Sequence, residues 1–373
     1  MQKKIIALAI AAAMAAPAAA MAEATVYGQV NMAYEVVDDG GDQGGVGLND
    51  NSRNRVSSNK SRLGFKGSEA LGDSGLTAVF QMEGEVMADT GASNLFGRNT
   101  FGGISGGFGT VVLGNHDTPY KMSTRGMDVF KDSIADNRSM MGNFFGMTTV
   151  DVRESDVLAY LTPDFSGFSA AVAIIGDTDN TLVNPTGANK VGATTLSAKY
   201  GMDNWSAALG YITLDGKGPA ANDFTATGTK LGGTYGMDMF SVGLVYEMLS
   251  LKTAGGGKNE QSNIYVGGTY NVSDAGKVKL AYTMAGESES TAGGVKTKNK
   301  DSASQVSLGY DHALSKNTTV FALYTSVTND DKSTGNSYGL TSTGSTGDTG
   351  PGTLAAGGVG NPTALAVGIR HMF

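Results

Sequence analysis

The chain has no cysteine, seven prolines and one tryptophan in 373 residues, and beyond its first twenty residues it has no long apolar run. The missing cysteines exclude disulfides and thiolate metal sites. Basic residues are also few, with 27 Lys and Arg against 35 Asp and Glu. A nucleic-acid partner would require a basic surface, so this charge balance argues against one. What the chain has in excess is glycine, with 55 residues.

The N-terminus has the order of regions found in an export signal. Lys3 and Lys4 precede an apolar stretch over 5–16, and Pro17 and the small residues around Ala22 follow. This order predicts a cleaved secretory signal peptide over residues 1–22, with the mature chain starting at Glu23. A helical membrane anchor fits less well, because a strand-like pattern follows at once. Cleavage would leave 25 basic residues against 35 acidic ones, a formal charge of −10.

The last eleven residues, 363–373, alternate between two kinds of side chain. One face carries Leu365, Val367, Ile369, His371 and Phe373, and the other carries Ala366, Gly368, Arg370 and Met372. Successive side chains of a strand point to opposite faces. One face of this segment is therefore mostly apolar while the other tolerates arginine, which is typical of a strand in a transmembrane barrel.

The same period-2 alternation recurs along the chain and predicts an all-β protein. The predicted strands are 24–36, 60–70, 75–87, 97–106, 109–116, 154–162, 166–176, 193–200, 204–214, 227–236, 239–250, 261–271, 276–286, 303–312, 317–328 and 363–373. That makes about sixteen, an even number, as single-chain bacterial barrels have. We therefore expect residues 23–373 to form one closed antiparallel transmembrane β-barrel.

The connections between these strands alternate in length. The short ones are 71–74, 163–165, 201–203, 237–238, 272–275 and 313–316, and the long polar ones are 37–59, 117–153, 177–192, 252–260, 287–302 and 329–362. An outer-membrane barrel has tight turns at its periplasmic end and long loops outside. A soluble sandwich or propeller would not sort its loops in this way.

Charged residues on the predicted strands indicate which face is wet. Arg62 shares a face with Lys66, opposite Leu63 and Phe65, and a charge on the lipid side would cost roughly 2 to 4 kcal/mol. By the same parity we place Phe80, Met82 and Phe101 toward lipid, and Gln81, Glu83, Glu85 and Arg98 inward. An inner wall lined by charge predicts a water-filled lumen.

Two segments and the ending of the chain resemble a known family. SRLGFKGSEALGDSGL at 61–76, RNTFGGISGGFGTVVLGNHDTPYK at 98–121 and the terminal VGIRHMF are similar to the general-diffusion porins of Gram-negative outer membranes. The resemblance implies a homotrimer of sixteen-stranded barrels in outer-membrane lipid. It also implies that the third long loop, 117–153, folds into the lumen and narrows it, and that Phe373 belongs to a C-terminal assembly signal.

The resemblance also suggests the residues of a pore constriction. The positions that match the family's motif are Asp128 and Asp132 on the loop, Arg62, Arg98 and Arg153 on the wall, and the interior Glu83, with Gln29, Lys131 and Asp136 as possible further lining residues. There are departures from the enteric pattern. The loop reads DVFKDS, and Gln29 stands where those porins often carry lysine.

Opposed carboxylates and guanidinium groups would set up a transverse field across a narrow column of water. Small polar solutes and ions could pass by passive diffusion, whereas apolar solutes would be disfavoured. From the acidic surplus of the mature chain, and from Asp128, Asp132 and Glu83, we expect a mild cation preference.

Other chemistry finds little support in the sequence. The three histidines, His116, His312 and His371, lack the spacing of a zinc site, and no nucleophile accompanies a base. We therefore expect no metal, no cofactor and no enzyme activity. The alternatives that stay open are a channel specific for sugar, phosphate or dicarboxylate, a structural or adhesive barrel, and an outer-membrane hydrolase.

Overall fold

The computed structural model describes residues 23–38, 40, 53–144, 148–178, 188, 190–218, 222–330, 338–341 and 360–373. The predicted signal peptide, 1–22, lies outside the described residues, as do parts of the long connections 37–59, 177–192 and 329–362. None of the helices in these ranges is long and apolar enough to cross a membrane.

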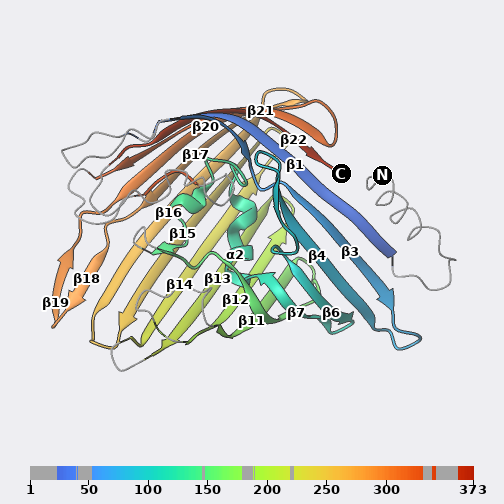
Figure 1. Ribbon diagram of the computed structural model, residues 1–373, viewed down its shortest axis with the longest axis horizontal. Helices are drawn as coiled ribbons and strands as arrows, with labels where there is room; N and C mark the ends of the chain where they lie inside the picture. The colour runs from blue at the N-terminus through green and yellow to red at the C-terminus, as the bar shows by residue number, and fades with distance from the viewer. Residues whose placement is uncertain are drawn as a thin grey trace.

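Sixteen antiparallel strands pair in a closed ring (Figure 1). In ring order they are β1 (Glu23–Asp38), β3 (Arg62–Ala70), β4 (Thr77–Met87), β6 (Thr100–Gly106), β7 (Gly109–Asp117), β10 (Arg153–Leu161), β11 (Phe168–Thr178), β12 (Lys190–Met202), β13 (Trp205–Lys217), β14 (Phe224–Gly236), β15 (Phe240–Thr253), β16 (Lys258–Asn271), β17 (Gly276–Ala285), β20 (Ala303–Ala313), β21 (Thr318–Asn329) and β22 (Thr363–Met372). Each overlaps one predicted strand, so the prediction of a sixteen-stranded antiparallel barrel is confirmed.

The ring closes where the first strand meets the last. β1 pairs with β22 from Gln29 opposite Met372 to Asp38 opposite Thr363. The backbone N–H of Gly28 donates to the carbonyl of Phe373 at 2.9 Å, and the N–H of Phe373 donates back to Gly28 at 3.1 Å. A closed ring leaves no strand edge with unpaired backbone N–H and C=O groups. A sheet can cross a bilayer only if these groups are paired, because lipid cannot hydrogen-bond them.

Six short strands were not predicted from the sequence pattern. β2 (Arg53–Ser58) pairs with β1, β5 (Ala92–Asn94) pairs with β4, and β18 (Glu289–Ala292) and β19 (Val295–Lys298) extend from β16. β8 (Asn143–Phe144) pairs with β9 (Thr148–Thr149). All six lie in connections between barrel strands, where two to six residues are too few for a period-2 signal to be recognised.

Side-chain exposure follows the predicted alternation. On β22, Ala364 and Ala366 are about 1% exposed, while Leu365 and Val367 are about half exposed on the outer, apolar face. On β4, Met82 is exposed and Glu83 is buried.

Phe101 is an exception, because the structure turns it inward rather than toward lipid. It lies opposite the inward-facing Gln81, and its ring centroid is 5.0 Å from that of His116. β6 begins only at Thr100, so Arg98 lies in a bend outside the strand and parity counted from Arg98 does not apply to Phe101.

The connection after β7 contains α2 (Pro119–Thr124) and the short 3₁₀ helices η1 (Arg125–Met127) and η2 (Asn137–Ser139). α2 begins there because the Thr118 side chain accepts from the N–H of Lys121 and Pro119 occupies the first turn. In Figure 1, α2 is drawn against strands that it contacts, β12 to β14. The local sequence therefore forms a helix, and the barrel supplies the surface on which it packs.

Hydrogen bonds attach this connection to side chains on the inner face of the barrel. The N–H of Tyr120 donates to Thr195 on β12 at 3.0 Å, and its hydroxyl donates to Glu247 on β15 at 2.6 Å. The N–H of Val129 donates to the Tyr265 hydroxyl on β16 at 2.9 Å. Three strands thus contribute to holding the segment 118–152.

Candidate functional site

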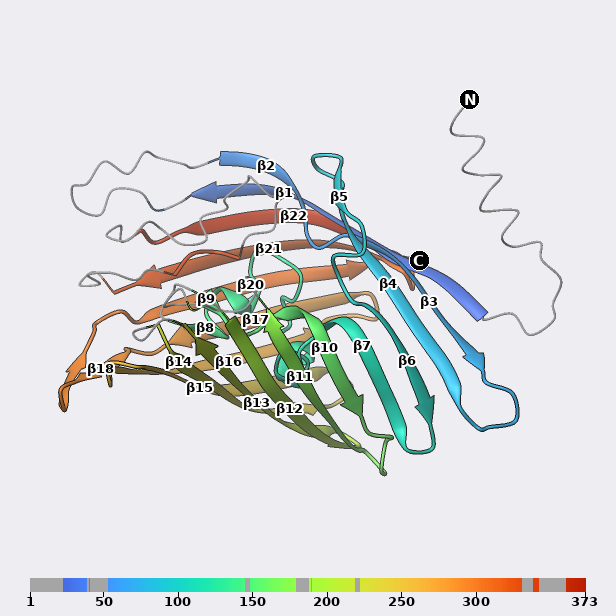
Figure 2. The same ribbon diagram turned by 60° about the horizontal axis from the view of Figure 1, so that its bottom comes forward.

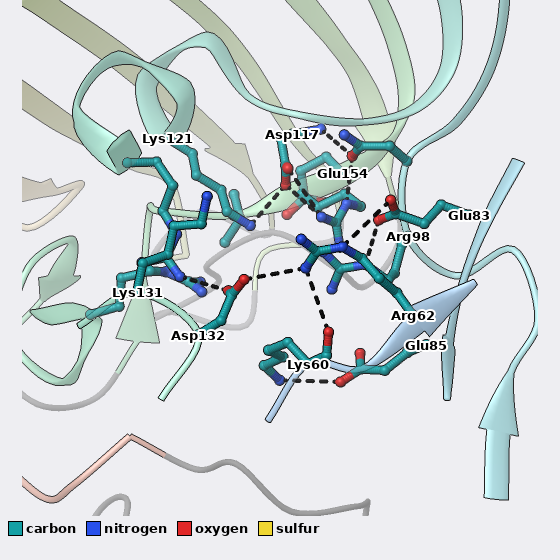
Figure 3. A pocket seen from close by; sticks show the side chains of 15 residues that line it. Lys60, Arg62, Glu83, Glu85, Arg98, Asp117, Lys121, Lys131, Asp132 and Glu154 are labelled. Carbon is teal, nitrogen blue, oxygen red and sulfur yellow. Dashed lines mark hydrogen bonds and ion pairs between the residues drawn. The ribbon is translucent and has the colours of Figure 1, made fainter. Parts of the chain in front are cut away.

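A cavity of about 460 Å³ lies between the segment 118–152 and the wall formed by β3, β4, β7, β10 and the bend before β6. Its lining residues are Lys60, Arg62, Glu83, Glu85, Arg98, Asn99, Asp117, Lys121, Arg125, Lys131, Asp132, Arg138, Val152, Arg153 and Glu154 (Figure 3). Eight of them are basic and five are acidic, a surplus of three positive charges. We refer to this space as the charged cavity.

One ion pair joins the loop to the wall across the charged cavity. Arg62 donates through Nη1 to Asp132 at 3.2 Å (Figure 3). Its Nη2 donates to the side-chain oxygen of Gln29 at 3.4 Å. Asp132 has a φ of +59°, in the left-handed region that aspartate tolerates better than most residues. The predicted pair of a wall arginine and a loop carboxylate is therefore in direct contact here.

The other predicted wall residues also lie at this cavity and are paired among themselves. Glu83 accepts from Arg98 and, at 2.9 Å, from the Tyr27 hydroxyl. Arg153 lies 2.9 Å from Asp117 and donates to Asn99 at 2.7 Å. The sequence placed Arg62, Glu83, Arg98 and Arg153 on one wall by strand parity and resemblance, and the structure brings all four to one cavity.

Arg125 organises the acidic side chains of the loop. Its guanidinium lies 2.5 Å from Asp136, 3.0 Å from Asp132 and 3.5 Å from Asp128. Burial opposes ionisation of Asp136, but Arg125 outweighs it and holds the pKa of that carboxyl well below its usual range. Burial, reinforced by the charge of Asp136, raises the pKa of Asp128 to about 7. We call Arg125 and these three aspartates the Arg125 cluster.

Two loop acids that were predicted to line the pore lie elsewhere in the structure. Asp128 and Asp136 are buried and do not line the charged cavity; their carboxylates accept backbone N–H groups within the loop. Of the three aspartates of the cluster, only Asp132 lines the charged cavity. The reason is that one guanidinium, which the sequence does not single out, draws the carboxylates to the inside of the loop.

Lys131 lines the charged cavity with its side chain exposed. Within the described part of the chain its ammonium has no ion pair, unlike those of Lys60 and Lys121, which lie 3.4 Å from Glu85 and 2.8 Å from Asp117. An unpaired cation contributes its whole charge to the water around it. Lys131 therefore adds most directly to the positive surplus.

A second set of buried charges fastens the segment to the opposite wall. Lys230 on β14 lies 3.0 Å from Asp151 of the segment and 3.6 Å from Glu247 on β15. Glu247 also accepts from the N–H of Gly142 at 2.7 Å. The sequence analysis did not identify Lys230 and Glu247. Each is a charged residue at an inward-facing position of a predicted strand, and this could have indicated them.

Among the described residues, no group of three or more His, Cys, Asp or Glu side chains is arranged to hold a metal ion. The acids of the Arg125 cluster converge on a guanidinium instead. The arrangement holds charges in fixed places around an open space.

Comparisons with known proteins agree with this geometry. The chain is 29% identical to the outer membrane porin protein 32 of Delftia acidovorans, over all of both chains, and 36% identical to the major outer membrane protein P.IB of Neisseria sicca, over 46% of each. Its structure resembles the anion-selective porin from Comamonas acidovorans with a TM-score of 0.75 and 26% identity, covering 95% of this chain and 100% of that one. The sequence profile of the Gram-negative porins matches residues 7–332, so the chain belongs to that family and is an outer-membrane porin.

Proposed function

We propose that the protein is a water-filled channel through which ions and small hydrophilic solutes diffuse passively, with a preference for anions. In this proposal the segment 118–152 folds into the lumen, and the charged cavity is the narrowest part of the path. The observation that carries the proposal is the surplus of three positive charges lining that cavity. The direct pair between Arg62 of the wall and Asp132 of the segment supports a path bounded by both.

The expected cation preference rested on the charge of the whole mature chain and on Asp128, Asp132 and Glu83. An ion in the constriction responds mainly to charges within about one Debye length, roughly 8 to 10 Å at physiological salt. Asp128 and Asp136 are enclosed in the Arg125 cluster, and Asp151 is paired with Lys230. Without Arg125 and Arg138, whose charges these aspartates balance, six basic and five acidic side chains line the cavity. The surplus is still positive, which favours chloride, phosphate and carboxylates over potassium. The anion-selective porin from Comamonas acidovorans, with its similar structure, supports the same sign.

We also propose export through the signal peptide over residues 1–22 and assembly as a homotrimer in outer-membrane lipid. The connection that contains β5 supports contact with another copy, because Leu95 and Phe96 on it are 71% and 45% exposed. Figure 2 shows this connection standing out from the ring of strands. Native mass spectrometry of the detergent-extracted protein should give three copies, and a monomer would overturn the assembly.

The channel proposal is tested by single-channel recording of the purified protein in planar bilayers under a potassium chloride gradient. We expect open-channel steps and a reversal potential with the sign of chloride permeation. A reversal potential toward potassium would overturn the anion preference. Silent membranes, from protein that has the heat-dependent electrophoretic mobility of a folded barrel, would favour a plugged structural barrel instead.

The role of the segment is tested by deleting residues 126–136. If the segment narrows the lumen, the deletion should raise single-channel conductance, because the path through the charged cavity widens. Unchanged conductance of a folded deletion variant would place the segment outside the conducting path.

A further inference from the structure

A second cavity, of about 500 Å³, lies on the inner face of the barrel beside the charged cavity. Strands β3, β4, β7 and β10 line both cavities, and β1 and β6 add Thr25 and Phe101 to the second one. Toward the periplasmic turns the lining loses charge on β4, from Glu83 to Gln81, and on β10, from Arg153 to Leu161, whereas β3 keeps a basic residue, from Arg62 to Lys66. We refer to this second space as the lower cavity.

The lower cavity has an apolar wall. Phe101, Val112 and Leu161 line it, and they belong to or pack against one apolar cluster. The ring of Phe101 is tilted by 55° against that of His116, so two rings stand side by side on this wall. Conduction of small inorganic ions makes no use of an apolar surface in contact with water, because such a surface binds apolar groups and not hydrated ions.

A cation with an available charge lines the same cavity. Lys66 is exposed, and its ammonium lies 5.2 Å from the centroid of the Tyr27 ring. In the described part of the chain it forms no ion pair, whereas Arg98 and Arg153 are each paired with a carboxylate. An anionic group that reaches Lys66 would therefore meet a cation that no carboxylate neutralises.

We propose that the lower cavity is a binding subsite for aromatic monocarboxylates passing through the channel. This inference rests on the proposed function as an anion-preferring channel. The carboxylate would pair with Lys66, and the ring would lie on the apolar wall of Phe101, Val112 and Leu161. Inorganic anions have no apolar part for this wall, and sugars have no charge for Lys66, so the subsite favours a solute that carries both.

The expected strength follows from the area that a ring can bury. Covering part of one face of an aromatic ring, at roughly 25 cal/mol per Å², gives about tenfold tighter retention than that of a carboxylate without a ring. Retention of this size delays a solute in the lumen without trapping it. It should be visible as a transient loss of chloride current.

The test uses the full mature protein in planar bilayers, with benzoate and acetate as probes at the same pH. Benzoate should halve the chloride current at about one tenth of the acetate concentration that does so. Phe101→Ser should remove this difference, and Lys66→Gln should weaken the effect of both probes. The matched control is Phe321→Ser, because Phe321 on β21 also packs inside the barrel but does not line the lower cavity.

Equal effects of benzoate and acetate on the native channel would overturn the inference, and so would a benzoate effect that persists unchanged in Phe101→Ser. If Phe101→Ser does not fold, Val112→Thr places a hydroxyl on the same wall with little change in volume, and it should reduce the benzoate preference. The reversal potential in the same membranes tests the channel proposal separately. Anion preference without benzoate preference rejects only the subsite, whereas cation preference rejects the function on which the subsite rests.

Discussion

The interior of the loop and the surface of the charged cavity use charged side chains in opposite ways. On the loop, the Arg125 cluster buries its carboxylates, and Asp128 and Asp136 are directed away from the open space. At the surface of the open space, basic side chains such as Arg62 and Lys131 are in contact with it. Asp128 and Asp136 therefore shape the loop, while the side chains at the cavity surface set the charge that a permeating ion meets. Net charge of the sequence is a poor guide to that local charge.

Of the changes considered, removing Arg125 should alter the arrangement of the loop most strongly. In Arg125→Met, three partly or fully buried carboxylates lose a common partner, and breaking a buried ion pair costs about 3 to 5 kcal/mol. We expect the segment to rearrange within an intact barrel. Single-channel recording should show a changed conductance and increased current noise.

The matched control for Arg125→Met is Lys131→Met, a nearby basic residue without an ion pair in the described structure. The control should keep a quiet open-channel current, and current noise is the quantity compared, because loss of the Lys131 charge itself changes conductance. If Arg125→Met has the conductance and current noise of the native channel, the cluster does not hold the loop in place.

Neutralising Lys131 should reduce the anion preference without disturbing the loop. A unit charge about 6 Å from the ion path, in surroundings close to water, is worth roughly threefold in relative permeability. Reversal potentials in a potassium chloride gradient at low ionic strength should show this shift for Lys131→Met. Lys217→Met serves as the control, because Lys217 is exposed beside Asp223 and does not line the cavity. Equal shifts in both variants would mean that selectivity follows net charge and not the charged cavity.

Lys121 should make the anion preference depend on pH. Burial, together with the positive charge of Arg138, lowers the pKa of Lys121 to about 8. The side chain is therefore cationic below that value and loses its charge as pH rises through it. We expect the anion preference to fall by up to about twofold between roughly pH 7 and 9. Reversal potentials across this range should be flatter in Lys121→Met, and an equally steep decline there would assign the titration to another group.

The fold could be read from the sequence because a barrel repeats one rule along the whole chain. Leu365 and Val367 face outward and Ala364 and Ala366 face inward, as alternation requires, and the wall charges Arg62 and Glu83 follow from the same parity. The rule fails where a strand is interrupted, as at Phe101. It gives no information about the segment 118–152, whose shape depends on long-range partners such as Glu247 and Tyr265.

The same limit explains why Asp128 and Asp132 looked equivalent in the sequence. They lie four residues apart and both fall at positions of the family's loop carboxylates, yet only Asp132 lines the charged cavity. What separates them is the direction in which Arg125 and the loop backbone draw each carboxylate. That direction is a property of the folded loop and not of the local residue pattern.

Comparing Asp132→Asn with Asp128→Asn tests this difference between the two loop acids. Asp132→Asn removes a negative charge at the cavity and should raise the anion preference by about threefold, as judged by reversal potentials. Asp128→Asn should leave selectivity near the native value. With a pKa of about 7, Asp128 is protonated below that pH, so the variant resembles the native loop most closely in mildly acidic solution. Equal selectivity shifts in the two variants at about pH 6 would mean that Asp128 reaches the ion path, and that the loop acids do not differ in the way proposed.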